Sequence, residues 1–157
     1  MQRIMNRRTQ TGAGLIEALV SVFVVSIGFI GFAGLQLNGL AASNNSLLRS
    51  KAVLLSYQMA DRVRANLPGA TAGAYNNLTG EPTNPGCIST GCTPAQLALN
   101  DYAEWSAEVA TVLPAGTGTI CLTSTPNACD GAGEVYAITL TWTEKGTQHT
   151  FVNALRP

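Results

Sequence analysis

The sequence predicts an α+β fold in which one long N-terminal helix packs on a small antiparallel sheet, together with one further helix. Three observations support this prediction. A long apolar run is followed by a stretch with helical periodicity, a strong helix start stands at Thr93, and alternating strand patterns lie near the C-terminus. With 157 residues, the chain is long enough for one modest domain and an appendage.

The charges are few and unevenly distributed. Charged residues make up 11% of the chain, whereas about 25% is usual in soluble domains. Between Arg8 and Arg49 the only charged residue is Glu17, and from Leu67 onward seven acids stand against two bases. Because Lys and Arg contacts to phosphate dominate nucleic-acid binding, we expect no nucleic-acid partner for this acidic part.

The apolar run extends from Ala13 to Leu37. About 20 apolar residues suffice to cross a hydrocarbon core of ~30 Å. Arginines at positions 3, 7 and 8 place the N-terminus in the cytoplasm by the positive-inside rule, so that everything after about Ala42 is exported. Two ordinary alternatives stay open, namely a plain single-span anchor and a cleaved secretory signal, although the latter would have a shorter apolar core.

Glu17 lies near the start of this run. On insertion scales a charged side chain at the bilayer centre costs about 2.5–3.5 kcal/mol, and such residues are functional candidates by default. A buried carboxylate is tolerable when a cation is within reach and strongly destabilising without one. The sequence therefore predicts a positively charged partner for Glu17.

The segment GAGLIE, residues 12–17, resembles the class III leader of type IV pilins and pseudopilins. The resemblance implies that a prepilin peptidase cleaves between Gly12 and Ala13 and that Ala13 becomes an N-methylated amino terminus. It also implies that Glu17 contacts the amino terminus of a neighbouring subunit. Many pilins carry Phe and Thr where this chain has Ala13 and Gly14. The chain then divides into a leader (1–12), a transmembrane and filament-core segment (13–42), an amphipathic stalk helix (43–67) and a periplasmic head (68–157).

The stalk shows an apolar stripe at steps of three and four residues, which predicts one buried helix face: Leu48, Ala52, Leu55, Met59 and Val63. We expect the helix to end near Asn66, before Pro68-Gly69, after about 50 residues or ~75 Å. Glycines recur at positions 28, 31 and 34. They indicate either close helix packing or a softness that lets the helix loosen in a filament.

The amino-acid sequence of the stalk narrows the resemblance to one class of pilin. The run SIGFIGFAGLQL, Arg49, the segment YQMADRVRAN (57–66) and Tyr75 resemble the PilV-type minor pilins. This resemblance implies a pilin-like fold and a subunit of type IV pilus assembly, in a tip or priming complex. Its partners would be the prepilin peptidase, other minor pilins and the major pilin, and it would pass from the inner membrane to the pilus. A minor pseudopilin of a type II secretion system and an exported adhesin on a pilin anchor remain alternatives.

The charged stalk residues Asp61, Arg62 and Arg64 have two interpretations. They form either a solvated helix face or a basic patch that meets the acidic heads of adjacent subunits. The solvated face is the simpler interpretation.

The head begins with residues 68–92, which are rich in Gly, Pro, Asn and Thr and indicate an irregular loop. Thr93-Pro94-Ala95-Gln96 is a capping-box helix start, and this helix ends at Pro114. Tyr102 and Trp105 lie on the apolar stripe of this helix, which predicts that they belong to the core and do not bind a ligand. Strands follow at 118–123, 134–143 and 148–153, the last two joined by a turn at 144–146.

Four cysteines lie in the exported part: Cys87, Cys92, Cys121 and Cys129. In an oxidising compartment they predict two disulfides, for which three connectivities exist. The close spacings favour pairing the first with the second and the third with the fourth. Zinc binding is the alternative, but the spacings fit the usual zinc pairs poorly.

Evidence for catalysis is weak in this sequence. His149 is the single histidine, and no nucleophile or carboxylate pattern surrounds it. Asp101, Glu104 and Glu108 share a helix face that is either a divalent-ion site or, more simply, solvated. We therefore expect no catalytic residue, no metal and no cofactor, and a protein that is not an enzyme.

Overall fold

The computed structural model describes residues 13–81, 83–87, 91–125 and 129–157. The chain divides into two compact units, Met1–Asn44 and Asn45–Pro157. The described part of the first unit is helical throughout. The second unit, called the head unit below, contains all the strands.

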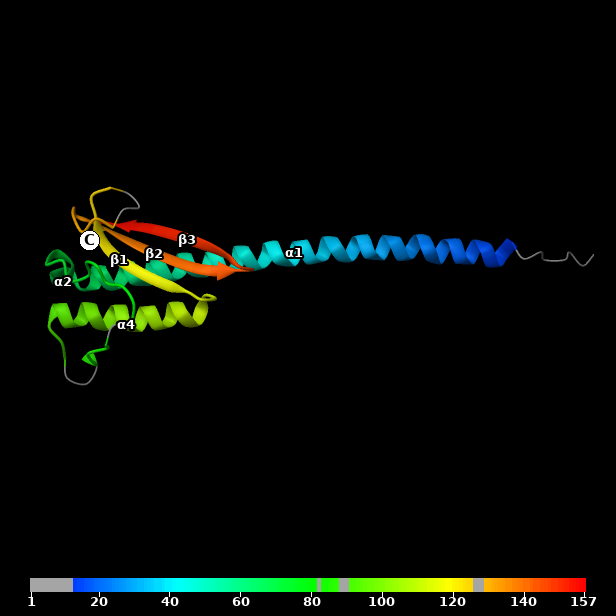
Figure 1. Cartoon of the computed structure of the whole chain (residues 1–157). Helices are drawn as coiled ribbons and strands as arrows, with labels where there is room; N and C mark the ends of the chain where they lie inside the picture. The colour runs from blue at the N-terminus through cyan, green and yellow to red at the C-terminus, as the bar shows by residue number, and fades with distance from the viewer. Residues whose placement is uncertain (1–12, 82, 88–90, 126–128) are drawn as a thin grey trace, which may run out of the picture. The chain divides into compact units, whose positions relative to one another are not determined.

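The elements follow one another as helices first and strands last (Figure 1). They are α1 (Ala13–Ala65), α2 (Leu67–Thr71), α4 (Pro94–Val112), β1 (Thr117–Thr123), β2 (Val135–Glu144) and β3 (Thr147–Leu155). The predicted long helix, the extra helix and the three-stranded antiparallel sheet are therefore confirmed.

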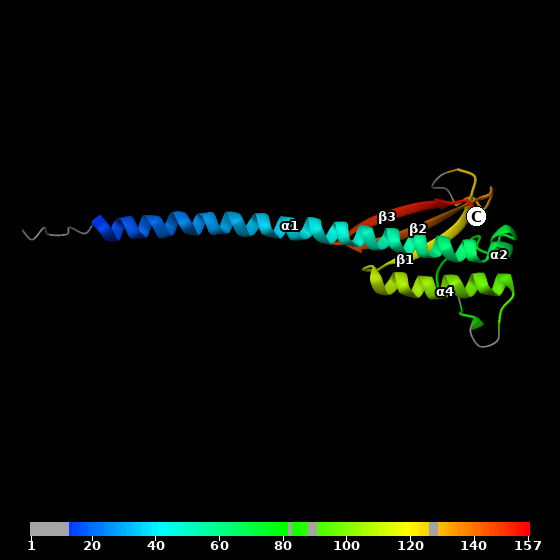
Figure 2. The ribbon, with the colours of Figure 1, turned by 180° about the vertical axis from the view of Figure 1, so that it is seen from behind.

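Within the head unit, the predicted stripe of α1 forms one side of the core. Leu48, Ala52, Leu55, Met59 and Val63 are all buried. The side of α1 turned away from this core stays open to solvent: Figure 2 views the head unit from the side on which α1 lies in front of the strands. The helix is thus amphipathic where it joins the head, as its periodicity predicts.

Helix α1 ends at Ala65, next to the predicted end at Asn66, but the residues that follow differ from the prediction. Pro68 and Gly69 do not begin an irregular loop but lie inside the short helix α2. The side chain of Asn66 caps α2 by accepting a hydrogen bond from the Gly69 N–H. Proline is tolerated in a first helical turn because the N–H groups there have no partner within the helix. The same residues thus end α1 and start α2, so the irregular segment begins only after Thr71.

The sheet has the order β1-β2-β3, and both pairs are antiparallel. Tyr136, Ile138, Leu140 and Trp142 of β2 are buried, and Thr139, Thr141 and Thr143 of the other face are partly exposed, as the alternation predicts. Ala137 departs from the alternation, because it is buried as well. Lys145 and Gly146 alone join β2 to β3, and both have positive φ, 49° and 79°. This is the conformation of a type I′ hairpin turn.

Helix α4 begins with the predicted capping box, in which the Thr93 side chain and the Gln96 side chain each bond the other's backbone N–H. Tyr102 and Trp105 are fully buried, as predicted. The Trp105 indole donates a 2.8 Å hydrogen bond to the Leu55 carbonyl of α1. The Tyr102 hydroxyl donates to the Gly118 carbonyl of β1 at 2.7 Å. These two side chains join α4 to both of its neighbours.

Candidate functional sites on the long helix and in the head

The first half of α1 is apolar around its whole circumference. Every described side chain from Gly14 to Leu40 is exposed in the single chain. By length and composition, one helix of the described chain, Gly14–Ala65, is able to cross a membrane. A helix that is apolar on all sides must be covered by lipid or by protein. This part of α1 is therefore built for an environment other than water.

Glu17 lies on this exposed apolar surface, one turn after the start of α1 at Ala13. Its backbone carbonyl accepts a 2.7 Å hydrogen bond from the Ser21 hydroxyl. Its carboxylate has no hydrogen-bond or ion-pair partner among the residues that the structure describes. Gly12 and the leader 1–12 lie outside the described residues. The partner and the cleavage site therefore remain predictions.

A second candidate site is a cluster of charged side chains between α1 and α4. Arg62 places its Nη1 atom 2.8 Å from Glu104 Oε2 and 3.5 Å from Asp101 Oδ1. The Asp101 side chain is only 11% exposed. The Tyr75 hydroxyl donates a 2.5 Å hydrogen bond to Asp101 Oδ2. Asp101 is thus held by both a cation and a phenol.

Asn66 completes this cluster with three hydrogen bonds. Its Nδ2 atom donates to the Tyr75 hydroxyl at 3.1 Å and to the Pro94 carbonyl at 2.8 Å. Its Oδ1 atom accepts from the Gly69 N–H at 3.2 Å. One buried amide therefore connects the end of α1, the cap of α2 and the start of α4.

Burial and pairing act on the titration of this cluster in different directions. Burial raises the pKa of Asp101, although the hydrogen bond from Tyr75 and the charge of Arg62 oppose this. The hydrogen bond from Arg62 lowers the pKa of the more exposed Glu104. Burial, reinforced by the hydrogen bond to Asp101, raises the pKa of Tyr75. The ion pairs with both acids outweigh burial and raise the pKa of Arg62.

This geometry corrects two interpretations of the sequence. Asp101 does not lie on a solvated face, because it is 8% exposed and hydrogen-bonded. Arg62 does not lie on one either, because it pairs with Glu104 and Asp101 of its own chain. The guanidinium of Arg62 is therefore paired within its own subunit. Arg64 pairs with Asp61 on the exposed surface at 3.2 Å.

The acidic face of α4 does not gather into a metal site. Asp101 and Glu104 share Arg62, and Glu108 accepts a 3.4 Å hydrogen bond from Gln58. Among the described residues no group of three His, Cys, Asp or Glu side chains could hold a metal ion. His149 stacks on Trp142 with ring centroids 5.5 Å apart.

The cysteines lie in two pairs at disulfide distance. Cys87 and Cys92 have Cα atoms 5.2 Å apart, and those of Cys121 and Cys129 are 5.6 Å apart. These are the pairs that the spacings favour. The first closes the loop before α4, and the second closes the segment after β1.

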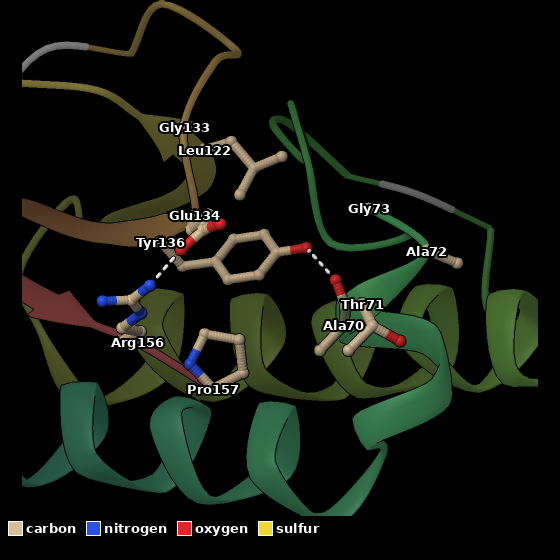
Figure 3. Close-up of a pocket in the computed structure, with 10 residues that line it drawn as sticks. All are labelled: Ala70, Thr71, Ala72, Gly73, Leu122, Gly133, Glu134, Tyr136, Arg156 and Pro157. Carbon is tan, nitrogen blue, oxygen red and sulfur yellow. Dashed lines mark hydrogen bonds and ion pairs between the residues drawn. The ribbon is translucent and has the colours of Figure 1, made fainter.

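A cavity of about 500 Å³ lies between α2 and the sheet (Figure 3), and no motif in the sequence predicts it. The Tyr136 hydroxyl donates a 2.7 Å hydrogen bond to the Ala70 carbonyl on one side of it. Glu134 and Arg156 are the charged residues of the lining, and they pair with each other. The Thr71 and Tyr136 hydroxyls of the lining both donate to backbone carbonyls of α2.

Comparison with known proteins gives one family match. Residues 34–103, a little under half of the chain, match the model of a family described as Tt1218-like, type IV pilin Tt1218. No match was found among the curated proteins or the solved structures. The matched range holds Arg62, Asn66, Tyr75 and Asp101 but begins after Glu17. The chain is thus similar to a type IV pilin family over its stalk and its buried polar cluster. This similarity supports the role of a pilin subunit.

Proposed function

We propose that this protein is a minor pilin of the PilV type that takes part in type IV pilus assembly. The observation that carries the proposal is the type IV pilin match over residues 34–103 on a chain whose helix α1 is able to cross a membrane. Before assembly, the subunit resides in the inner membrane with its N-terminus in the cytoplasm. It then enters a tip or priming complex with other minor pilins and the major pilin.

The proposal assigns a role to the residues at the start of α1. Prepilin peptidase cleaves between Gly12 and Ala13, and Ala13 becomes the N-methylated amino terminus. Glu17 carries an exposed carboxylate in an apolar surface, so it needs a cation when that surface is covered. The new amino terminus of a neighbouring subunit supplies this cation. The role is structural, and nothing in it requires a cofactor.

The test is deletion of the gene followed by complementation, with surface pili and twitching motility as readouts. Wild-type chain restores piliation, whereas Glu17→Ala and a Gly12 variant that blocks cleavage do not. Mass spectrometry of the mature subunit reads the cleavage site and the methyl group directly. Full piliation with both variants contradicts the proposal. Normal piliation in the deletion strain with loss of attachment to a surface would instead favour an adhesin on a pilin anchor.

A further inference from the structure

The two edges of the sheet differ in what covers them. Strands β1 and β3 are the borders of the sheet, with β2 between them (Figure 1). In an antiparallel strand every second residue directs its backbone N–H and C=O groups away from the neighbouring strand. Such groups on a border strand are able to pair with a further strand unless something else binds them.

The edge of β1 is covered by the chain itself. Ile120 exchanges two backbone hydrogen bonds with Leu78, at 3.0 and 3.1 Å. The Leu122 N–H donates to the side chain of Asn76 at 2.9 Å, and the Leu122 carbonyl accepts from the Gly131 N–H at 3.0 Å. A further strand therefore finds the ladder on this side already occupied.

The edge of β3 has no such cover. Because a two-residue turn joins β2 to β3, Glu144 and Thr147 form a hydrogen-bonded pair, and the odd-numbered residues of β3 bond to β2. The outward-facing residues are Gln148, Thr150, Val152 and Ala154. Their backbone groups have no hydrogen-bond partner in the part of the chain that the structure describes. We call these backbone groups the open edge.

The open edge also lacks the features that keep border strands from pairing with other chains. Those features are charged residues, prolines and β-bulges. Strand β3 has nine residues, Thr147–Leu155, and contains no Pro, Asp, Glu, Lys or Arg. Its register with β2 runs one to one along the whole strand, so it has no bulge. The strand is therefore suited to receive a further strand along its full length.

The chemistry of the open edge defines its partner. Alternating N–H and C=O groups along an extended backbone are matched by another extended backbone about 4.8 Å away, whereas a helix bonds its backbone groups internally. Thr150 and Val152 favour uncharged, β-branched residues opposite them. The exposed Lys145 in the turn favours an acidic residue at that end of the partner strand.

A second copy of the chain does not supply this strand. Its β1 edge is already covered. Two identical edges pair symmetrically only when the strands are antiparallel, and this pairing rotates the second head by half a turn in the plane of the sheet. The stretch of α1 that packs on that sheet then points the opposite way. Two copies anchored in one membrane point the same way, and in this respect alone the inference rests on the proposed function.

We propose that the open edge of β3 binds an extended strand of a different protein chain, with an uncharged middle and an acidic residue at the end near Lys145. The partner strand becomes the fourth strand of the sheet, next to β3. Because the backbone supplies most of the bonds, the loss of an outward N–H group blocks the pairing. The loss of a side chain beside it has little effect.

The first test is photo-cross-linking of the full chain in cells that assemble the pilus. A photo-reactive amino acid replaces Thr150 or Val152, and Thr119 of β1, at the other border of the sheet, is the control position. Mass spectrometry maps the partner residue in each adduct. The two β3 probes should reach residues two apart in one segment of the partner, because facing strands share this period. The control should give about one tenth of the adduct or less.

The second test removes one backbone donor. Thr150→Pro deletes an outward N–H and no bond to β2, and proline is tolerated in this position of a border strand. With the probe at Val152, Thr150→Pro should lower the adduct yield about fivefold or more, whereas Thr150→Ala, which keeps the N–H, should change it less than about twofold. The fluorescence of Trp142 in the purified variant checks that the sheet is intact. If it is not, Ala154→Pro near the strand end takes its place.

The outcomes separate this inference from the proposed function. Adducts three or four residues apart in the partner, adducts to a second copy, or equal losses with Thr150→Pro and Thr150→Ala overturn the inference. The absence of any adduct in cells that carry pili and hold the chain in their membrane also overturns it. Absence of the chain from the membrane fraction contradicts the proposed function instead, and the spacing of the adducts then still decides whether a strand binds the open edge.

Discussion

At the scale of single residues, Asn66 joins three segments of the head unit. It is 4% exposed and bonds α2, Tyr75 and the start of α4 at once. A buried amide whose partners belong to three segments fixes their relative positions, since each bond lost leaves a polar group unpaired. The asparagine that follows the end of α1 is therefore explained by the fold of the subunit itself.

Asn66→Ala should lower the free energy of unfolding by about 3 kcal/mol, because it leaves the Gly69 N–H and the Pro94 carbonyl without their partner. Urea unfolding of the full chain in detergent micelles, followed by the fluorescence of Trp105 and Trp142, measures this. Asn45→Ala is the matched control at an exposed position and should change the free energy by less than about 0.5 kcal/mol. Equal losses in both variants would contradict the role assigned to Asn66.

The burial of Tyr102 predicts how the stability of the head changes at alkaline pH. Burial raises the pKa of Tyr102 to about 12 from 10.0. Because the folded state holds this proton more tightly than the unfolded state, the stabilisation is complete below pH 10 and is lost as the pH rises towards 12. Tyr102→Phe should lower stability by about 1 kcal/mol at pH 8, where the hydrogen bond to Gly118 is lost. It should also reduce the decline between pH 10 and 12, as urea titrations at several pH values will show. An unchanged slope would contradict this assignment.

At the scale of elements, the contact between α4 and β1 depends on the absence of a side chain. A Cβ atom added at Gly118 would overlap the ring of Trp105. The ring is fully buried and its indole is bonded to Leu55, so it cannot move aside without breaking that bond. The glycine in β1 is therefore required by close packing, although the strand pattern alone gives it no such role.

Gly118→Ala should destabilise the head by about 1–3 kcal/mol through overpacking, measured by the same unfolding assay. Gly28→Ala is the control: a Cβ there meets no atom within 4 Å, so the unfolding of the head should not change. A loss of stability in both variants, or in neither, would count against the packing argument. A Cβ atom at Gly28, Gly31 or Gly34 meets no atom within 4 Å in the single chain, which leaves both interpretations of these glycines open for the assembled filament.

At the scale of the whole molecule, charge pairing is largely internal to the head. Arg62, Arg64 and Arg156 each bind an acid of the same chain. A general attraction between a basic stalk and acidic heads therefore has fewer cations available than the sequence suggests. The apolar surfaces of α1 remain the main uncovered feature of the described chain. The proposed function therefore concerns what covers α1.

The sequence by itself determined the elements of this protein. Apolar stripes with a period of 3.6, the alternation in β2 and the Thr93 capping box are local signals, and each one acts within a few residues along the chain. They predicted α1, α4 and the three strands correctly. The start of α2 is also a local signal, at Asn66 and Pro68, but the same residues equally fit the start of a loop. The apolar run and the single charged residue within it, Glu17, are likewise evident from the sequence alone.

Only the tertiary structure decided which polar residues form ion pairs and hydrogen bonds within the subunit. Arg62 and Glu104 are 42 positions apart, Asn66 and Pro94 are 28 apart, and Tyr75 and Asp101 are 26 apart. Helical periodicity placed Arg62 and Asp101 off the apolar stripes and so favoured water around them. Whether such a residue faces water or another element depends on how the two helices pack against each other. That packing is set by the whole core, and therefore no local pattern in the sequence contains it.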